Sequence, residues 1–178
     1  GMWASGFGAV PGAKVSLVGL EYDIVEPEFN YIIENLLSER GMNMKYASLQ
    51  NRPRDGKMWL DLPNGARYEA KSWERQASLK GKEVDAYIFC EAYQLPGIEC
   101  FTTVKQNLVA RNGYAVFPTT PDRPWVKELH QLGHGAEPDW ACICDIPRSQ
   151  NIYTYSEKDF TLDQKLMTKE KFLIAHEG

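Results

Sequence analysis

The chain has 178 residues, 43% of them hydrophobic and 25% charged, and a formal net charge of -4 at pH 7. This length fits one domain with a real core, and the acidic balance argues against an autonomous nucleic-acid binder, so any DNA contact has to be local. No apolar run reaches membrane-spanning length, no leader opens the chain, and the four cysteines lack disulfide-framework spacing. We therefore expect a cytoplasmic protein with reduced thiols that makes no membrane contact, and we treat Gly1 as a tag residue.

The first predicted elements are an irregular segment, a strand and a helix. Residues 1–12 are rich in glycine and small residues without any period, so we expect them to be irregular. Residues 13–20 alternate and are β-branched, which predicts a strand. A helix should begin at Glu26-Pro27 and end near Gly41. Its apolar residues share one helical face: Phe29, Ile32, Ile33, Leu36 and Leu37.

The middle of the chain predicts a hairpin followed by a β-α-β unit. Residues 57–62 and 66–72 flank Pro63-Asn64-Gly65, a tight-turn signal, and should form an antiparallel hairpin. Apolar runs at residues 84–92 and 113–121 indicate two parallel strands. The segment from Glu99 to Arg111 between these runs is expected to be their crossover helix.

Three further elements complete the expected order: a helix over residues 124–132, a strand over residues 140–146 and a helical stretch over residues 159–176. The predicted fold is therefore α/β, with a mainly parallel sheet, flanking helices and one antiparallel hairpin. We expect residues 13–146 to form the α/β core and residues 147–178 a helical closing segment of the same single domain.

Polar side chains follow the two strands of the β-α-β unit. Glu91 ends the first run, and Thr119 and Thr120 end the second. Since the carboxyl ends of parallel strands line the ligand crevice, these side chains should project there together, with Lys80-Gly81 at the same edge. A carboxylate beside hydroxyl groups suits the positioning of a water and a phosphate. A solvated edge carboxylate and a threonine helix start are the alternative interpretations.

The only dense basic cluster surrounds Lys80 and also contains Lys71, Arg75 and Lys82. A solvated loop is the favoured interpretation of this cluster, ahead of phosphate contact. Lys80 stays a weak candidate for contact with phosphate or DNA.

His130 and His134 lie four residues apart on an expected helix, and Cys142 and Cys144 follow closely, so zinc is one interpretation of this group. Exposed histidines and core cysteines are favoured instead. A Cys-x-Cys on an extended strand lacks the turn that usually wraps a metal, and Gly133 should fray the helix before His134. We therefore predict no metal site.

Together these segments resemble the ATPase domain of the large terminase subunit, the motor that packages DNA into the heads of tailed phages. Residues 11–22 are similar to the family's strand after the first motor helix, and the hairpin with Ser78-Leu79-Lys80-Gly81 resembles the turn into the Walker B strand. Residues 86–91 resemble Walker B itself, and Thr119-Thr120-Pro121 resembles the coupling motif that links hydrolysis to movement. Residues 168–178 resemble the helix that closes the ATPase domain.

The resemblance implies a P-loop NTPase-like (ASCE) fold, with Glu91 as the catalytic base that orients water, Cys90 at the Walker B magnesium position, and Thr119 and Thr120 as the coupling motif. It implies ATP and Mg²⁺ as the family's ligands, although we expect neither to be bound by this chain. It also implies double-stranded DNA, the portal and the small terminase subunit as partners, and a homo-oligomeric motor in the host cytoplasm.

Two departures from the family pattern stand out. The Walker A pattern Gly-x-x-x-x-Gly-Lys-Ser/Thr is absent, because Gly6-Phe7-Gly8 has no following lysine and threonine. Cys90 replaces the usual aspartate, and a soft thiol is a poor partner for Mg²⁺. We therefore expect an N-terminally truncated, partial ATPase domain without the nuclease domain, and inactive alone. The alternatives are a catalytically inactive α/β interaction module of a packaging assembly and another helicase-like ASCE ATPase core.

Overall fold

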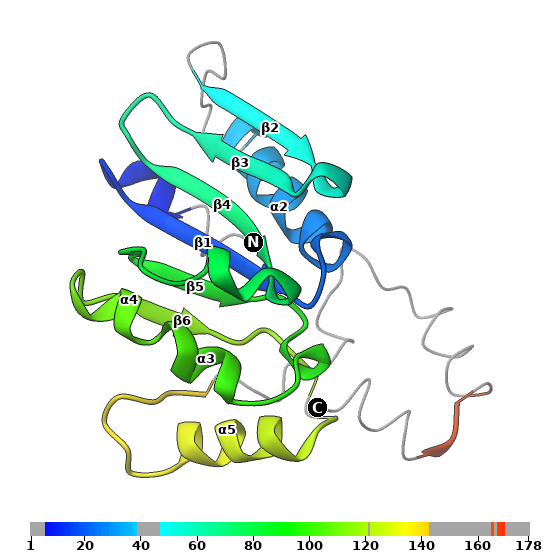
Figure 1. Cartoon of the computed structure of the whole chain (residues 1–178). Coiled ribbons are helices and arrows are strands. Elements are labelled where there is room, and N and C mark those ends of the chain that lie inside the picture. The colour runs from blue at the N-terminus through cyan, green and yellow to red at the C-terminus, as the bar shows by residue number, and fades with distance from the viewer. Residues whose placement is uncertain (1–5, 39–46, 121, 143–164, 166, 170–178) are drawn as a thin grey trace. The chain divides into compact units, whose positions relative to one another are not determined.

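The computed structural model describes residues 6–38, 47–120, 122–142, 165 and 167–169 (Figure 1). The chain divides after Pro118 into two compact units, residues 1–118 and residues 119–178. Each unit is described by itself below. None of the helices in the described part of the chain is long and apolar enough to cross a membrane.

In the described residues, a six-stranded sheet forms the centre of the first unit, in the order β2-β3-β4-β1-β5-β6. β1 pairs in parallel with β4 and β5, and β5 pairs in parallel with β6, whereas β3 runs antiparallel to both β2 and β4. The strands are β1 (Lys14–Gly19), β2 (Ser48–Arg52), β3 (Lys57–Asp61), β4 (Arg67–Ser72), β5 (Ala86–Phe89) and β6 (Tyr114–Val116). The predicted α/β class, parallel β-α-β unit and β3-β4 hairpin are confirmed. β2 was not predicted.

The helices follow the predicted order with different boundaries. They are α2 (Tyr22–Ser38), the short helices α3 (Glu99–Val104) and α4 (Gln106–Val109), and α5 (Pro124–His134) in the second unit. The predicted start of the first helix is wrong, because α2 begins at Tyr22 and carries Pro27 inside it. Burial of Val25 extends the apolar face of α2 toward its start and outweighs the hydrogen bond that Pro27 removes. The predicted end at Gly41 lies outside the described residues.

Both faces of the sheet are covered, and β5 shows how its residues alternate between them. Ala86, Ile88 and Cys90 belong to the core cluster that α2 completes with residues such as Phe29. Tyr87 and Phe89 point the other way, where they contact Asn107 of α4 and Phe101 of α3. Figure 1 shows α2 behind the sheet and the shorter helices in front. A parallel strand with helices on both faces needs an unbroken apolar run, as residues 84–92 have.

The strand predicted over residues 140–146 is wrong where the structure describes it, since residues 140–142 lie in no strand. The amide of Trp140 donates to the Glu137 carbonyl oxygen at 3.2 Å, which holds a turn around Pro138 rather than an extended ladder. Residues 143–146 and nearly all of the helical stretch predicted over residues 159–176 lie outside the described residues.

Candidate functional site

Glu91 lies at the carboxyl end of β5 in a strained backbone conformation. The amide of Cys90 still donates to Val18 of β1 at 2.8 Å, and the next residue leaves the sheet with φ 47° and ψ 55°. A left-handed conformation costs a non-glycine residue about 1–2 kcal/mol. The Glu91 side chain is exposed. Strain of this kind concentrates at functional positions, so the geometry makes Glu91 the strongest site candidate in the first unit.

The segment after β6 reaches the same edge of the sheet. The Ala92 amide, one residue beyond Glu91, donates to the Pro118 carbonyl oxygen at 3.4 Å. Thr119 and Thr120 follow Pro118 directly but belong to the second unit, where both are half-buried and the Thr119 hydroxyl donates to the Thr120 carbonyl oxygen at 3.3 Å. The predicted meeting of these hydroxyls with Glu91 stays a prediction.

The alternative interpretation of the two threonines as a helix start is not what the structure shows. The N-cap residue of α5 is Arg123, which makes no side-chain cap, and Pro124 occupies the first turn as predicted. Thr119 and Thr120 therefore precede this helix without capping it.

Cys90 is part of the hydrophobic core. Only 4% of the residue is exposed, and its Sγ donates weakly to the Ile88 carbonyl oxygen at 3.9 Å. Burial raises the pKa of Cys90 to about 12, so the thiol keeps its proton at neutral pH. A neutral, buried thiol does not suit Mg²⁺, which takes oxygen ligands. The described residues therefore do not fit a magnesium ion at this position.

Lys80 does not join Glu91, and the prediction that Lys80-Gly81 shares its edge is wrong. Gly81 lines a cavity of about 460 Å³ together with Lys14 and Arg67, which are the first residues of β1 and β4. The turn therefore lies toward the amino ends of the parallel strands. The short helical segment after β4 (Trp73–Ser78) carries the chain back across the sheet before β5 begins.

Two other members of the basic cluster are neutralised within the sheet. Lys71 pairs with Oε1 of Glu69, and Lys82 pairs with its Oε2 at 2.9 Å. Burial alone would raise the pKa of Glu69, but the hydrogen bonds from both lysines outweigh it and lower that pKa. These ion pairs give Lys71 and Lys82 a structural role that the solvated-loop interpretation missed.

The Gly6-Phe7-Gly8 segment has a packing role. Residues 7–9 form a short 3-10 helix, and Gly8 is buried. A Cβ atom at Gly8 would lie 2.8 Å from Cδ2 of Leu36, so the glycine lets this turn pack closely on α2. The segment is no phosphate-binding loop, which agrees with the missing Walker A pattern.

An aromatic cluster that sequence reasoning missed supports the Glu91 loop. Phe89 precedes Cys90 and Glu91, and its ring stacks on Phe117, which precedes Pro118. Phe101 of α3 packs edge-on against both rings. The apolar residues Phe89 and Phe117 at the ends of two adjacent parallel strands were the available sequence signal for this contact.

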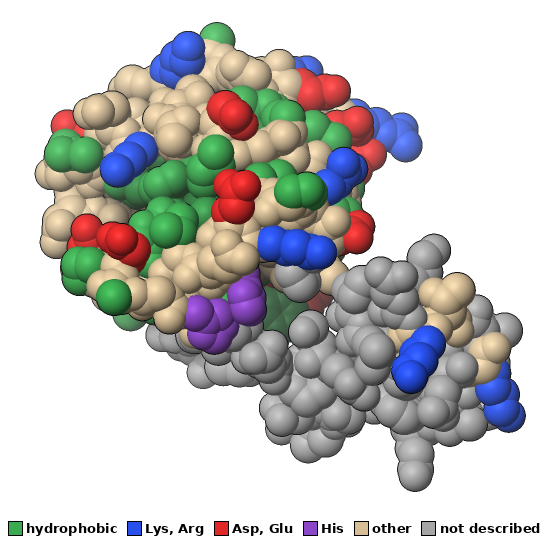
Figure 2. Space-filling model, turned by 90° about the horizontal axis from the view of Figure 1, so that it is seen from below, with side chains coloured by type: hydrophobic (Ala, Val, Ile, Leu, Met, Phe, Trp, Pro, Cys, Tyr) green, Lys and Arg blue, Asp and Glu red, His purple; other side chains and the backbone are tan. Residues whose placement is uncertain are grey.

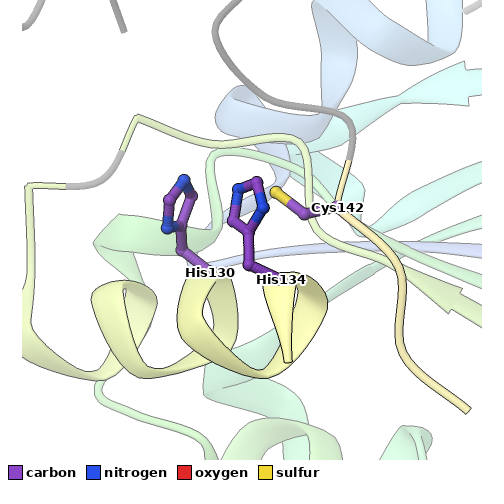
Figure 3. Close-up of side chains that lie close together, drawn as sticks. All are labelled: His130, His134 and Cys142. Atoms are coloured by element: carbon purple, nitrogen blue, oxygen red, sulfur yellow. The ribbon is translucent and has the colours of Figure 1, made fainter. Parts of the chain in front are cut away.

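In the second unit, α5 continues through His134, so the prediction that Gly133 frays it is wrong. Cys142 is half-buried rather than a core residue. Its Sγ and one ring nitrogen from each of His130 and His134 lie within 4.8 Å of one another (Figure 3). The three described cysteines, Cys90, Cys100 and Cys142, are free thiols.

Comparisons with known proteins agree with this fold. No protein-family profile matches the sequence, and no curated protein does. The solved large terminase ATPase domain of Thermus phage P74-26 matches with a TM-score of 0.65 and 17% identity, over 96% of this chain and 77% of that chain. The chain has the fold of a phage large terminase ATPase domain.

Structures of a second large terminase, from another thermophilic bacteriophage, match equally well. One crystal form has a TM-score of 0.69 and 12% identity, over 97% of this chain and 41% of that chain. The same terminase in complex with ADP matches with a TM-score of 0.68 and 11% identity, over 94% of this chain and 40% of that chain. The present chain therefore spans about two fifths of this second terminase.

Proposed function

We propose that this chain is the ATP-hydrolysing part of a DNA-packaging motor of the large terminase type. The observation that carries the proposal is Glu91, which is exposed and strained at the carboxyl end of β5. The terminase fold supports it, since parallel sheets bind their ligands at this edge. The second terminase was solved with ADP and with ATP-γ-S, so nucleotide binding occurs on this fold.

In this proposal the Glu91 carboxylate hydrogen-bonds a water molecule and orients it toward the terminal phosphate of ATP. Thr119 and Thr120, which directly follow the strand-end contact at Pro118, transmit the outcome of hydrolysis to the second unit. Neither Cys90 nor the segment around Gly8 fits Mg²⁺ or a phosphate group, so the proposal assigns those contacts to other residues. Lys80 is left out because its turn lies toward the opposite edge. Double-stranded DNA, the portal and the small terminase subunit are the proposed partners.

The test compares Glu91→Gln with Glu83→Gln, which changes an exposed carboxylate near the other end of β5. The proteins to assay are the 178-residue chain and a chain carrying it together with a Walker A segment, each with DNA and Mg-ATP. We expect no turnover from the 178 residues alone. In the longer protein, Glu91→Gln should lower the rate about 100-fold or more, while Glu83→Gln leaves it unchanged. Equal rates for both variants would refute the proposed role of Glu91.

The core position of Cys90 favours a second candidate, a catalytically inactive interaction module of the packaging assembly. A protonated thiol stands where the family pattern has an acidic residue. On this alternative, the longer protein hydrolyses no ATP, and Glu91→Gln leaves co-sedimentation with the portal protein unchanged. DNA-stimulated hydrolysis that requires Glu91 would exclude it.

A further inference from the structure

The cluster of His130, His134 and Cys142 has the composition of a transition-metal site. The two histidines lie four residues apart on α5, so they occupy the same face of the helix on successive turns. Their ring centroids are 4.5 Å apart with planes inclined by 58°. Figure 3 shows the Cys142 side chain directed toward the two rings from the segment after the helix. Figure 2 shows the histidine side chains together on the molecular surface, open to solvent.

Gly133 brings the thiol to this face by allowing a close backbone approach. A Cβ atom at Gly133 would lie 2.7 Å from Cβ of Cys142 and 2.9 Å from its backbone nitrogen. Any other residue at this position, between the two histidines, would push the Cys142 backbone away from α5. The glycine costs a helix about 1 kcal/mol relative to alanine, and the turn between Glu137 and Trp140 returns the chain toward the helix.

We propose that His130, His134 and Cys142 bind a zinc ion. Two imidazole nitrogens and a thiolate suit Zn²⁺, while Mg²⁺ and Ca²⁺ require oxygen ligands. Ligand atoms on a tetrahedral zinc lie about 3.4–3.6 Å apart, as follows from bond lengths of about 2.0–2.3 Å. The observed separations, all within 4.8 Å, exceed this by little more than about 1 Å. A water molecule takes the fourth position, and the ion ties the segment that contains Cys142 to α5.

The test measures Zn²⁺ affinity of the reduced 178-residue chain by competition with a chromophoric chelator. Co²⁺ serves as a spectroscopic probe, because a thiolate ligand produces a sulfur-to-cobalt charge-transfer band. We expect one Zn²⁺ per chain and a charge-transfer band that Cys142→Ser abolishes. His130→Ala and His134→Ala should each weaken binding at least tenfold, since even residues behind the ligands are worth about 10–100-fold. His176→Ala is the matched control, because it removes the third histidine of the sequence and should leave the affinity unchanged.

Gly133→Ala separates the proposed geometry from general loss of structure. The added methyl favours helix formation but displaces Cys142, so Zn²⁺ affinity should fall while the helix content measured by circular dichroism is kept. The proposal is overturned if the chain binds no stoichiometric Zn²⁺, or if His176→Ala weakens binding as much as His130→Ala and His134→Ala do. It is also overturned if Gly133→Ala binds Zn²⁺ as tightly as the parent chain.

Discussion

The rings of Phe89 and Phe117 stack with centroids 4.8 Å apart and planes only 4° from parallel. Phe89 is the last residue of β5 and Phe117 directly follows β6, so the stack joins the ends of two adjacent parallel strands. Phe101 contacts both rings at nearly right angles, with interplanar angles of 84° and 82°. The loops that carry Glu91 and Pro118 therefore begin from a common apolar support.

Phe89→Ala should lower the free energy of unfolding by about 3–5 kcal/mol, because it removes a fully buried ring and leaves a cavity. Phe117→Ala should cost less, since Phe117 is half-buried. Urea unfolding followed by circular dichroism measures both changes. Tyr114→Ala is the control, as this β6 side chain is 61% exposed. A Phe89→Ala variant no less stable than Tyr114→Ala would contradict the assigned role.

Glu91→Gly should stabilise the protein by about 1 kcal/mol, because glycine adopts a positive φ without strain. Glu91→Ala keeps the strained backbone and should leave the stability nearly unchanged. Thermal unfolding of the two variants isolates the backbone effect from loss of the carboxylate. If alanine stabilises as much as glycine, the cause is charge removal and not backbone strain.

Cys90→Asp should lower the free energy of unfolding by about 3–5 kcal/mol, because it places an unpaired charge in a site that is 4% exposed. Cys90→Ala, which adds no charge, should cost much less. Chemical denaturation measures stability, and a Mg-nucleotide titration of each variant accompanies it. A stable Cys90→Asp protein with stronger Mg-nucleotide binding would show instead that the position is a degraded magnesium site.

The stability of the protein should fall at alkaline pH in part because of Cys90. Its pKa is about 12 in the folded chain, against about 8.5 for an unfolded thiol. The contribution is complete below the unfolded pKa and is lost as pH rises toward 12, since the unfolded state alone releases the proton there. Urea midpoints measured from neutral pH upward should decline less steeply for Cys90→Ala than for the parent chain. Identical slopes would show that Cys90 does not contribute.

Short-range signals in the sequence were sufficient to predict most of the sheet. The hairpin between β3 and β4 follows from Asn64-Gly65, where Gly65 adopts φ 83° and its amide donates to the Leu62 carbonyl oxygen at 2.9 Å. β5 and β6 were predictable because a strand covered on both faces must be apolar throughout. β2 carried no such signal. Its polar residues Ser48, Gln50, Asn51 and Arg52 form a strand through hydrogen bonds to β3, which only the tertiary structure supplies.

The sequence by itself determined which residues could carry chemistry, and the tertiary structure decided which of them meet. It singled out Glu91 because a carboxylate that ends an apolar run is visible locally, but the left-handed backbone there depends on packing around it. Lys80 lies eleven residues before Glu91, yet the segment between β4 and β5 carries it toward the opposite edge. Cys142 reaches His130 and His134 because Gly133 admits the returning backbone. Contacts of this kind depend on close packing between segments, which no local pattern of residues encodes.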